Sequence, residues 1–180
     1  RLTNFFPEFP EYGKQISVRH LLTHTSGLLD YEDLIPPGTT IPVLDQDVLR
    51  ILVSADVRRR TAAQPDNDRL LTSAATHFPP GTQYRYSNSG YALLALIVEV
   101  RSGQKFARFL KENIFEPLKM THTLAYEEGY GAIANRAYGH THGTNGWHRT
   151  DQSLTSSVLG DGGVYSSLAD LFKWDQALYK

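Results

Sequence analysis

Tyr86-Ser87-Asn88, followed by an apolar run from Tyr91 to Val100, is the stretch of this 180-residue chain that decides its fold. In an extended segment successive side chains point to opposite sides, so we expect Tyr86 and Asn88 on one side and Ser87 on the other. A phenol beside a carboxamide, on a short polar loop at the start of a helix, is typical of a small reactive site. The tripeptide alone is weak evidence, because short motifs recur by chance.

The apolar run predicts a helix that is buried on nearly every face. Either Ser87 or Ser89 can cap its first turn with a side-chain oxygen, and Gly103 is typical of its carboxyl-terminal stop. The run is far shorter than the roughly 20 apolar residues that span a bilayer. We therefore expect a rigid internal post, and rigid elements hold reactive groups more precisely than loops do.

Five further segments carry short motifs along the chain. They are Pro7–Pro10, Ile16–Leu28, Pro80–Thr82, Phe115–Met120 and Gly160–Ser167. Together with Tyr86-Ser87-Asn88, and in the expected order, they resemble the serine β-lactamase-related family over almost the whole chain. This family contains class C β-lactamases, D,D-carboxypeptidases, D-aminopeptidases and esterases on one penicillin-recognising fold.

The resemblance implies a mainly α chain, the helical portion of the α+β β-lactamase/transpeptidase-like fold, with loops and short strands over residues 121–165. Residues 1–180 would form a single helical subdomain of a larger domain, without its amino- and carboxyl-terminal sheet-forming parts. The local patterns agree with this expectation. Caps and apolar spacing predict helices over 17–23, from Asp45 or Asp47 to about Ala55, over 70–76 and over 106–114.

A last helix is predicted after Ser167. Ser167 with Asp170 resembles a capping box, and the apolar face of the helix would carry Leu168, Leu171, Phe172 and Trp174. Residues 160–163 are rich in glycine but lack the lysine and spacing of a phosphate loop. We expect them to form a tight turn at the rim of a substrate cleft.

The family's chemistry uses three elements: Ser-x-x-Lys, Tyr-x-Asn, and Lys/His-Ser/Thr-Gly. By this resemblance Tyr86 is the general base/acid and Asn88 hydrogen-bonds the substrate amide. The intact protein would cleave an amide or ester bond through an acyl-serine intermediate, without a metal or organic cofactor. A free tyrosine has a pKa near 10, so it needs nearby cations to act as a phenolate at neutral pH. In the family two lysines of the other elements supply them, and how tyrosine and lysine share the proton stays open.

Only the Tyr-x-Asn element is present in its expected place. The one Ser-x-x-Lys, Ser102 to Lys105, comes after Tyr86 and straddles the helix stop at Gly103, so we do not expect it to act. No Lys/His-Ser/Thr-Gly triplet occurs. We expect an internal piece of a longer enzyme, inactive by itself. Its uncovered apolar faces would favour self-association.

Three other interpretations compete with this one. The chain could be a non-catalytic binding module of penicillin-recognising shape. Ser87 or Ser89 could be a nucleophile with His24 or His77 as its base, although no Gly-x-Ser-x-Gly elbow occurs. For Ser26, its place at the end of a short helix indicates a structural role in a turn. A His-based metal hydrolase could use His140, His142 and His148, but the His-Glu-x-x-His helix of such enzymes is missing, so we expect no metal site.

Composition limits the partners. The net charge is −1 and no basic stripe occurs, so we expect no nucleic-acid binding. The chain has no cysteine, which excludes disulfides, and no apolar segment long enough to be a membrane span. The expected partner is a small-molecule or peptide substrate: a β-lactam, a D-amino-acid peptide or an ester. A periplasmic or secreted bacterial location is expected from the resemblance alone.

Overall fold

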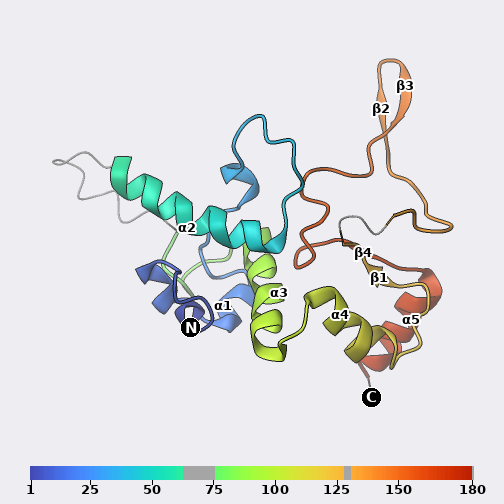
Figure 1. The fold of residues 1–180 in the computed structure, drawn as a ribbon, viewed down its shortest axis with the longest axis horizontal. Helices are drawn as coiled ribbons and strands as arrows, with labels where there is room; N and C mark the ends of the chain where they lie inside the picture. Colours follow the sequence, from blue (N-terminus) through green and yellow to red (C-terminus); the bar gives the residue numbers. More distant parts are fainter. Residues whose placement is uncertain (63–75, 128–130, 180) are drawn as a thin grey trace.

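The computed structural model describes residues 1–62, 76–127 and 131–179, and Figure 1 shows two lobes. The first holds helices α1 (Val18–Leu22), α2 (Asp45–Ala62) and α3 (Asn88–Ser102). The second holds helices α4 (Phe106–Leu110) and α5 (Leu168–Ala177) with four short strands. The helix predicted over 70–76 lies almost entirely outside the described residues.

A single apolar core fills the first lobe. Helices α2 and α3 pack on each other, α1 packs on α3, and short 3-10 helices at Leu2–Asn4, Glu11–Lys14 and Glu32–Leu34 close the lobe. Apolar burial is what stabilises such a core, at about 25 cal/mol for each Å² removed from water. The largest apolar side chains that are fully buried are Leu2, Ile16, Leu21, Leu28, Tyr31, Val48, Leu93 and Val158.

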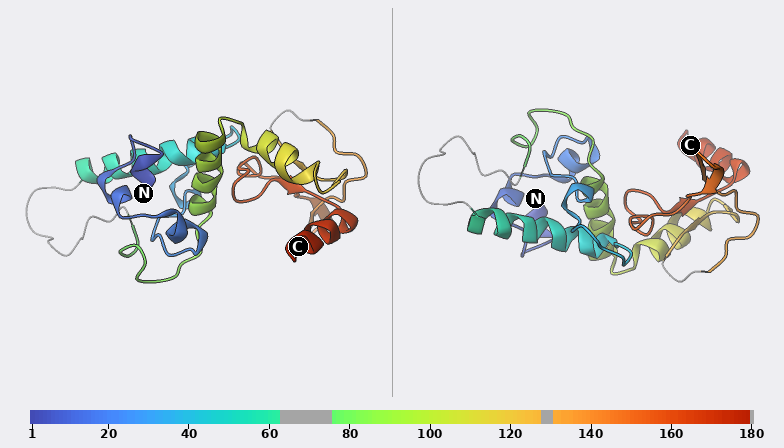
Figure 2. Two further views of the ribbon diagram at one scale, coloured as in Figure 1. Left: turned by 90° about the horizontal axis from the view of Figure 1, so that it is seen from below. Right: turned by 90° about the horizontal axis from the view of Figure 1, so that it is seen from above.

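Val158 reaches this core from the far end of the sequence. Figure 2 shows the returning chain beside α3, between the two lobes. The backbone N–H of Val43 donates to the carbonyl oxygen of Leu154 over 2.7 Å. The returning segment is therefore a structural part of the first lobe.

Helix α3 begins and ends as predicted. Ser87 is its cap and accepts the Gly90 N–H over 3.3 Å. Gly103 ends it at φ 70, a left-handed conformation that glycine adopts without strain. The expected burial on nearly every face is confirmed from Ser89 to Glu99, where no residue is exposed, and ends in the last turn, where Val100 is 54% exposed. The exposed part of α3 is therefore its last turn, from Val100 to Ser102.

The other predicted helices are present with shifted bounds. Ser17 caps α1 through a reciprocal capping box with His20. Helix α2 continues past Ala55 to Ala62. The segment predicted as one helix over 106–114 is α4 followed by a π-helical turn at Lys111–Phe115.

The strands are short and lie within the 121–165 region, as expected. Strand β1 (Leu124–Ala125) pairs antiparallel with β4 (Val164–Tyr165). Strand β2 (His140–Gly143) pairs with β3 (Gly146–Arg149) in a hairpin that projects from the second lobe (Figure 1). Helical structure outweighs strand in the described chain. None of its described helices is long and apolar enough to cross a bilayer.

Helix α5 confirms half of the predicted capping box. Ser167 accepts the Asp170 N–H over 3.2 Å. The Asp170 carboxylate does not return to the cap, because it accepts the backbone N–H of His122 over 2.6 Å and the Thr123 hydroxyl over 2.9 Å. This buried carboxylate joins α5 to the turn before β1. The apolar face of the helix is exposed, at 87% for Leu168.

Candidate active site

Tyr86 and Asn88 lie at the amino-terminal end of α3. Tyr86 is 60% exposed whereas Ser87 is 2% exposed, so the two side chains point to opposite sides as predicted. Asn88 is the first residue of α3, and its backbone N–H donates to the Asp30 carboxylate over 3.4 Å. Within the described part of the chain, the Tyr86 hydroxyl and the Asn88 carboxamide have no protein hydrogen-bond partner.

The loop that carries Tyr86 is held by the segment after α1. The N–H of Gly81 donates to the Thr25 carbonyl over 2.8 Å, and the N–H of Arg85 donates to the His24 carbonyl over 2.9 Å. Gly27 makes this close approach possible, since a Cβ there would lie 2.3 Å from the Phe78 carbonyl oxygen. The backbone of the first segment therefore fixes where the Tyr86 loop runs.

Three tyrosine rings surround His24. The imidazole lies 4.5 Å from the Tyr86 ring and 5.0 Å from the Tyr91 ring, measured between centroids, with interplanar angles of 33° and 24°. The Tyr84 ring meets it edge-on at 5.9 Å. The Nδ1 atom of His24 accepts the backbone N–H of Ser87 over 3.2 Å. The aromatic group next to Tyr86 is thus centred on one histidine.

Ser89 ties the start of α3 to the core. Its buried hydroxyl donates to the Leu29 carbonyl over 2.7 Å and accepts the Tyr31 N–H over 2.8 Å. Ser87 is occupied as the helix cap. Both hydroxyls serve the backbone, and the His24 contact is to the Ser87 amide. The geometry therefore gives no support to a Ser87 or Ser89 nucleophile paired with His24.

Ser26 and the one Ser-x-x-Lys pair are also structural. The Ser26 hydroxyl is buried and accepts the Leu28 N–H over 3.3 Å. Ser102 donates its hydroxyl to the Val98 carbonyl, and Lys105 pairs with Glu99 over 3.1 Å. The serine and lysine face different partners across the helix stop, as the sequence predicted.

The turn over 160–163 closes against the start of α3. The Asp45 carboxylate accepts the backbone N–H groups of Leu159 and Gly160, each over 2.9 Å. A Cβ at Gly160 would lie 2.3 Å from the Tyr91 carbonyl oxygen. Residue 160 must therefore be glycine for the turn to reach α3.

Asp161 is the unusual carboxyl group of this turn. It accepts the hydroxyl of the buried Tyr31 over 2.9 Å. Burial, together with the nearby carboxylates of Asp45 and Glu32, raises the pKa of Asp161 to about 7, while the Tyr31 hydrogen bond opposes the rise. Burial and the charge of Asp161 in turn raise the pKa of Tyr31 far above its ordinary value.

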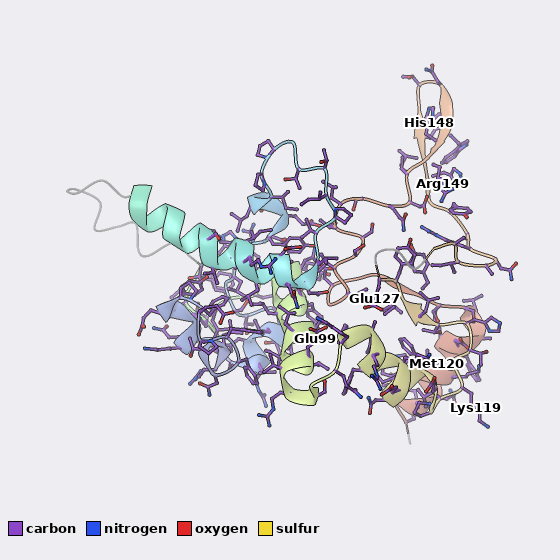
Figure 3. All side chains as sticks on the ribbon, in the orientation of Figure 1. Glu99, Lys119, Met120, Glu127, His148 and Arg149 are labelled. Carbon is purple, nitrogen blue, oxygen red and sulfur yellow. The ribbon has the colours of Figure 1, made fainter. Side chains whose placement is uncertain are left out.

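The histidines of the hairpin are not brought together. Thr141 is paired with His148, and His142 with Trp147, so His148 lies on the face opposite to His142. Figure 3 shows His148 at the projecting hairpin, away from the helices. In the ranges that the structure describes, no group of three or more His, Asp or Glu side chains could hold a metal ion.

Comparison with known proteins places this arrangement in a family. A family model described as beta-lactamase matches residues 1–179. The chain belongs to the beta-lactamase family. It is 32% identical over 192 aligned residues to a penicillin-binding protein of Bacillus subtilis, and 30% identical over 187 to the D-aminopeptidase of Brucella anthropi.

A solved structure shares the fold of this beta-lactamase family chain. It is the D-amino acid amidase from Ochrobactrum anthropi SV3 complexed with L-phenylalanine amide, with a TM-score of 0.74 and 27% identity. The alignment covers 99% of this chain and 46% of the amidase. The chain likewise covers 39% of the penicillin-binding protein and 30% of the D-aminopeptidase, against 100% and 97% of its own length.

Two contacts near the site of this beta-lactamase family chain could not be predicted from the sequence. The sequence suggests His24 only as a base for a serine, whereas in the structure its ring lies against Tyr86. The contact of Tyr31 with Asp161 joins residues 130 apart in the chain. No local residue spacing predicts either contact, because both depend on how distant segments of the chain pack.

Proposed function

We propose that Tyr86 is the general acid/base, and Asn88 the substrate contact, of a serine hydrolase of the β-lactamase type. In this proposal the nucleophilic serine and its lysine come from polypeptide outside these 180 residues. The observation that carries the proposal is the exposed Tyr86 phenol, held by a backbone and ring framework at the end of α3. The family membership supplies the reaction type.

The proposed reaction begins when the serine oxygen attacks the carbonyl carbon of an amide or ester. The serine proton passes to the Tyr86 phenolate oxygen as the new C–O bond forms. When the tetrahedral intermediate collapses, Tyr86 returns that proton to the departing amine or alcohol, and the acyl-serine remains. A water molecule then hydrolyses the acyl-serine, with Tyr86 again handling the proton.

Asn88 would orient the substrate in this reaction. Its backbone N–H is used by Asp30, whereas its carboxamide can both donate and accept a hydrogen bond. Such a group suits the amide next to a scissile bond. The substrate is a β-lactam, a D-amino-acid amide or peptide, or an ester. A shared fold alone does not fix the substrate. Because two relatives are named as a D-aminopeptidase and a D-amino acid amidase, the D-amino-acid compounds are the first to assay.

The experiment compares full-length protein with two matched variants, Tyr86→Phe and Tyr84→Phe. Both remove one exposed phenol hydroxyl from the same loop and keep the ring. With nitrocefin, a p-nitrophenyl ester and D-phenylalanine p-nitroanilide as substrates, Tyr86→Phe should lower kcat about 10²- to 10⁴-fold, the usual worth of a general acid/base. Tyr84→Phe should leave kcat unchanged.

Two results would count against this function. Equal turnover by Tyr86→Phe and Tyr84→Phe would remove Tyr86 from the mechanism. Saturable binding of these compounds without turnover by the wild-type protein would instead support a binding module. An Asn88→Ala variant separates binding from chemistry, because loss of a substrate contact should raise KM as well as lower kcat.

A further inference from the structure

We propose that His24 is the positioning residue of Tyr86, a role that rests on the proposed function of Tyr86 as acid/base. His24 does not touch the reacting atoms in this proposal. It acts by fixing the backbone on both sides of Tyr86 and by supporting the face of the Tyr86 ring. Two sets of contacts and the backbone conformation of His24 carry the inference.

The first set brackets Tyr86 along the backbone. The Arg85 N–H donates to the His24 carbonyl over 2.9 Å, and the Ser87 N–H donates to the His24 Nδ1 over 3.2 Å. The two amides that flank Tyr86 are therefore bound by the same residue, one by its main chain and one by its side chain. A shift of His24 would move both anchors of Tyr86 together.

The second set supports the ring. The His24 imidazole is 4.5 Å from the Tyr86 ring and 5.0 Å from the Tyr91 ring. Tyr91 belongs to α3, and its hydroxyl donates to the Leu22 carbonyl at the end of α1 over 3.2 Å. Among the described residues His24 is the only ring in contact with Tyr86. It links an exposed loop side chain to two helices.

The third observation is the backbone of His24 itself. Its φ is 54, in the left-handed region that histidine, asparagine and aspartate visit more often than other non-glycine residues. Acceptance of the Ser87 N–H also assigns the proton of the neutral ring to Nε2. The position therefore requires a left-handed residue with a hydrogen-bond acceptor one bond beyond its Cγ. Asparagine satisfies both requirements without a ring, and phenylalanine supplies the ring without the acceptor.

These two substitutions form a matched pair in the full-length protein. His24→Phe should lower kcat about 10- to 100-fold with little change in KM, because a small displacement of a catalytic group costs rate. His24→Asn should lose less than about 10-fold, since it retains the acceptor for Ser87. The matched control is His148→Phe on the projecting hairpin, which should leave kcat unchanged. Thermal unfolding midpoints show whether each variant is folded.

A second comparison separates positioning from general damage. In a Tyr86→Phe background, His24→Phe should cost less than about twofold, because the hydroxyl that His24 positions is already absent. A purely structural role would produce the same loss in both backgrounds. Equal losses would overturn the proposal.

An NMR measurement tests the contact without turnover. The ring signal of Tyr86, assigned by its disappearance in Tyr86→Phe, should shift in His24→Asn because the neighbouring imidazole ring current is lost. It should not shift in His148→Phe. A Tyr86 signal that is unaffected by His24→Asn would overturn the proposal. If the wild-type protein cleaves none of the substrates, the proposed function fails, and this signal then tests only the contact between His24 and Tyr86.

Discussion

Asp161→Asn tests whether the Asp161 carboxyl, in the turn that packs against α3, is protonated in the folded protein. Burial raises the pKa of the Asp161 carboxyl from 3.8 to about 7. The folded protein therefore keeps this proton at pH values where the unfolded chain has released it. Stability should fall as pH rises from about 4 to about 7 and then stay level. Asparagine removes the titration and keeps an oxygen that can accept the Tyr31 hydroxyl.

The size of the effect follows from the pKa. At about 1.4 kcal/mol for each tenfold change in proton affinity, the ceiling is about 4 kcal/mol in the free energy of unfolding. Asp161 is partly exposed, so solvent screening reduces the expected value to about 1–2 kcal/mol. Asp161→Asn should thus be more stable than the wild type by this amount at pH 8, and equally stable near pH 4.

Urea unfolding of the full-length protein, followed by circular dichroism at pH 4 and pH 8, measures this difference. The matched control is Asp45→Asn. Burial also raises the pKa of Asp45, but its two oxygens accept two backbone N–H groups, and asparagine can replace only one of them. Asp45→Asn should therefore be less stable at both pH values. If Asp161→Asn destabilises the protein equally at pH 4 and pH 8, the reasoning about a protonated Asp161 is refuted.

Two further predictions concern packing and association. Gly160→Ala should cost about 2–3 kcal/mol in the free energy of unfolding, because the added methyl would overlap the Tyr91 carbonyl and the backbone of Ala92. The matched control is Gly162→Ala, which should be neutral because a Cβ at this position meets no atom within 4 Å. Thermal unfolding of both variants checks this, and equal midpoints would contradict it. The 180-residue chain should self-associate with rising concentration through the exposed face of α5, and Phe172→Lys should weaken the association. Sedimentation velocity measures the self-association, and a monomer at every concentration would contradict association through the apolar face of α5.

Local hydrogen bonding could be predicted from the sequence. The caps at Ser17, Ser87 and Ser167, and the stop at Gly103, each depend on atoms within a few residues of one another. The alternation of Tyr86 and Ser87 followed in the same way from backbone geometry. Short-range rules are sufficient for such features because they do not depend on where the rest of the chain lies.

Features that depend on distant segments could not be predicted. Asp170 was expected to close its own capping box, but the His122 N–H, 48 residues earlier, takes its carboxylate. The apolar run correctly indicated that α3 is surrounded from Ser89 to Glu99, but it does not show where the neighbouring segments end, and Val100 is exposed. Within the candidate site, the motif predicts Tyr86 and Asn88 as site residues, while the contacts of His24 are seen only in the tertiary structure.

The insertion of Val158 among residues of the first lobe has a consequence for biosynthesis. Helices α1, α2 and α3 leave the ribosome long before Leu154, whose carbonyl binds Val43, and before Val158. The core of the first lobe therefore stays incomplete while more than fifty residues after α3 are translated. Nascent chains arrested before Leu154 has left the ribosome should be cut by protease within α2, and those long enough for Asp161 to have left it should resist.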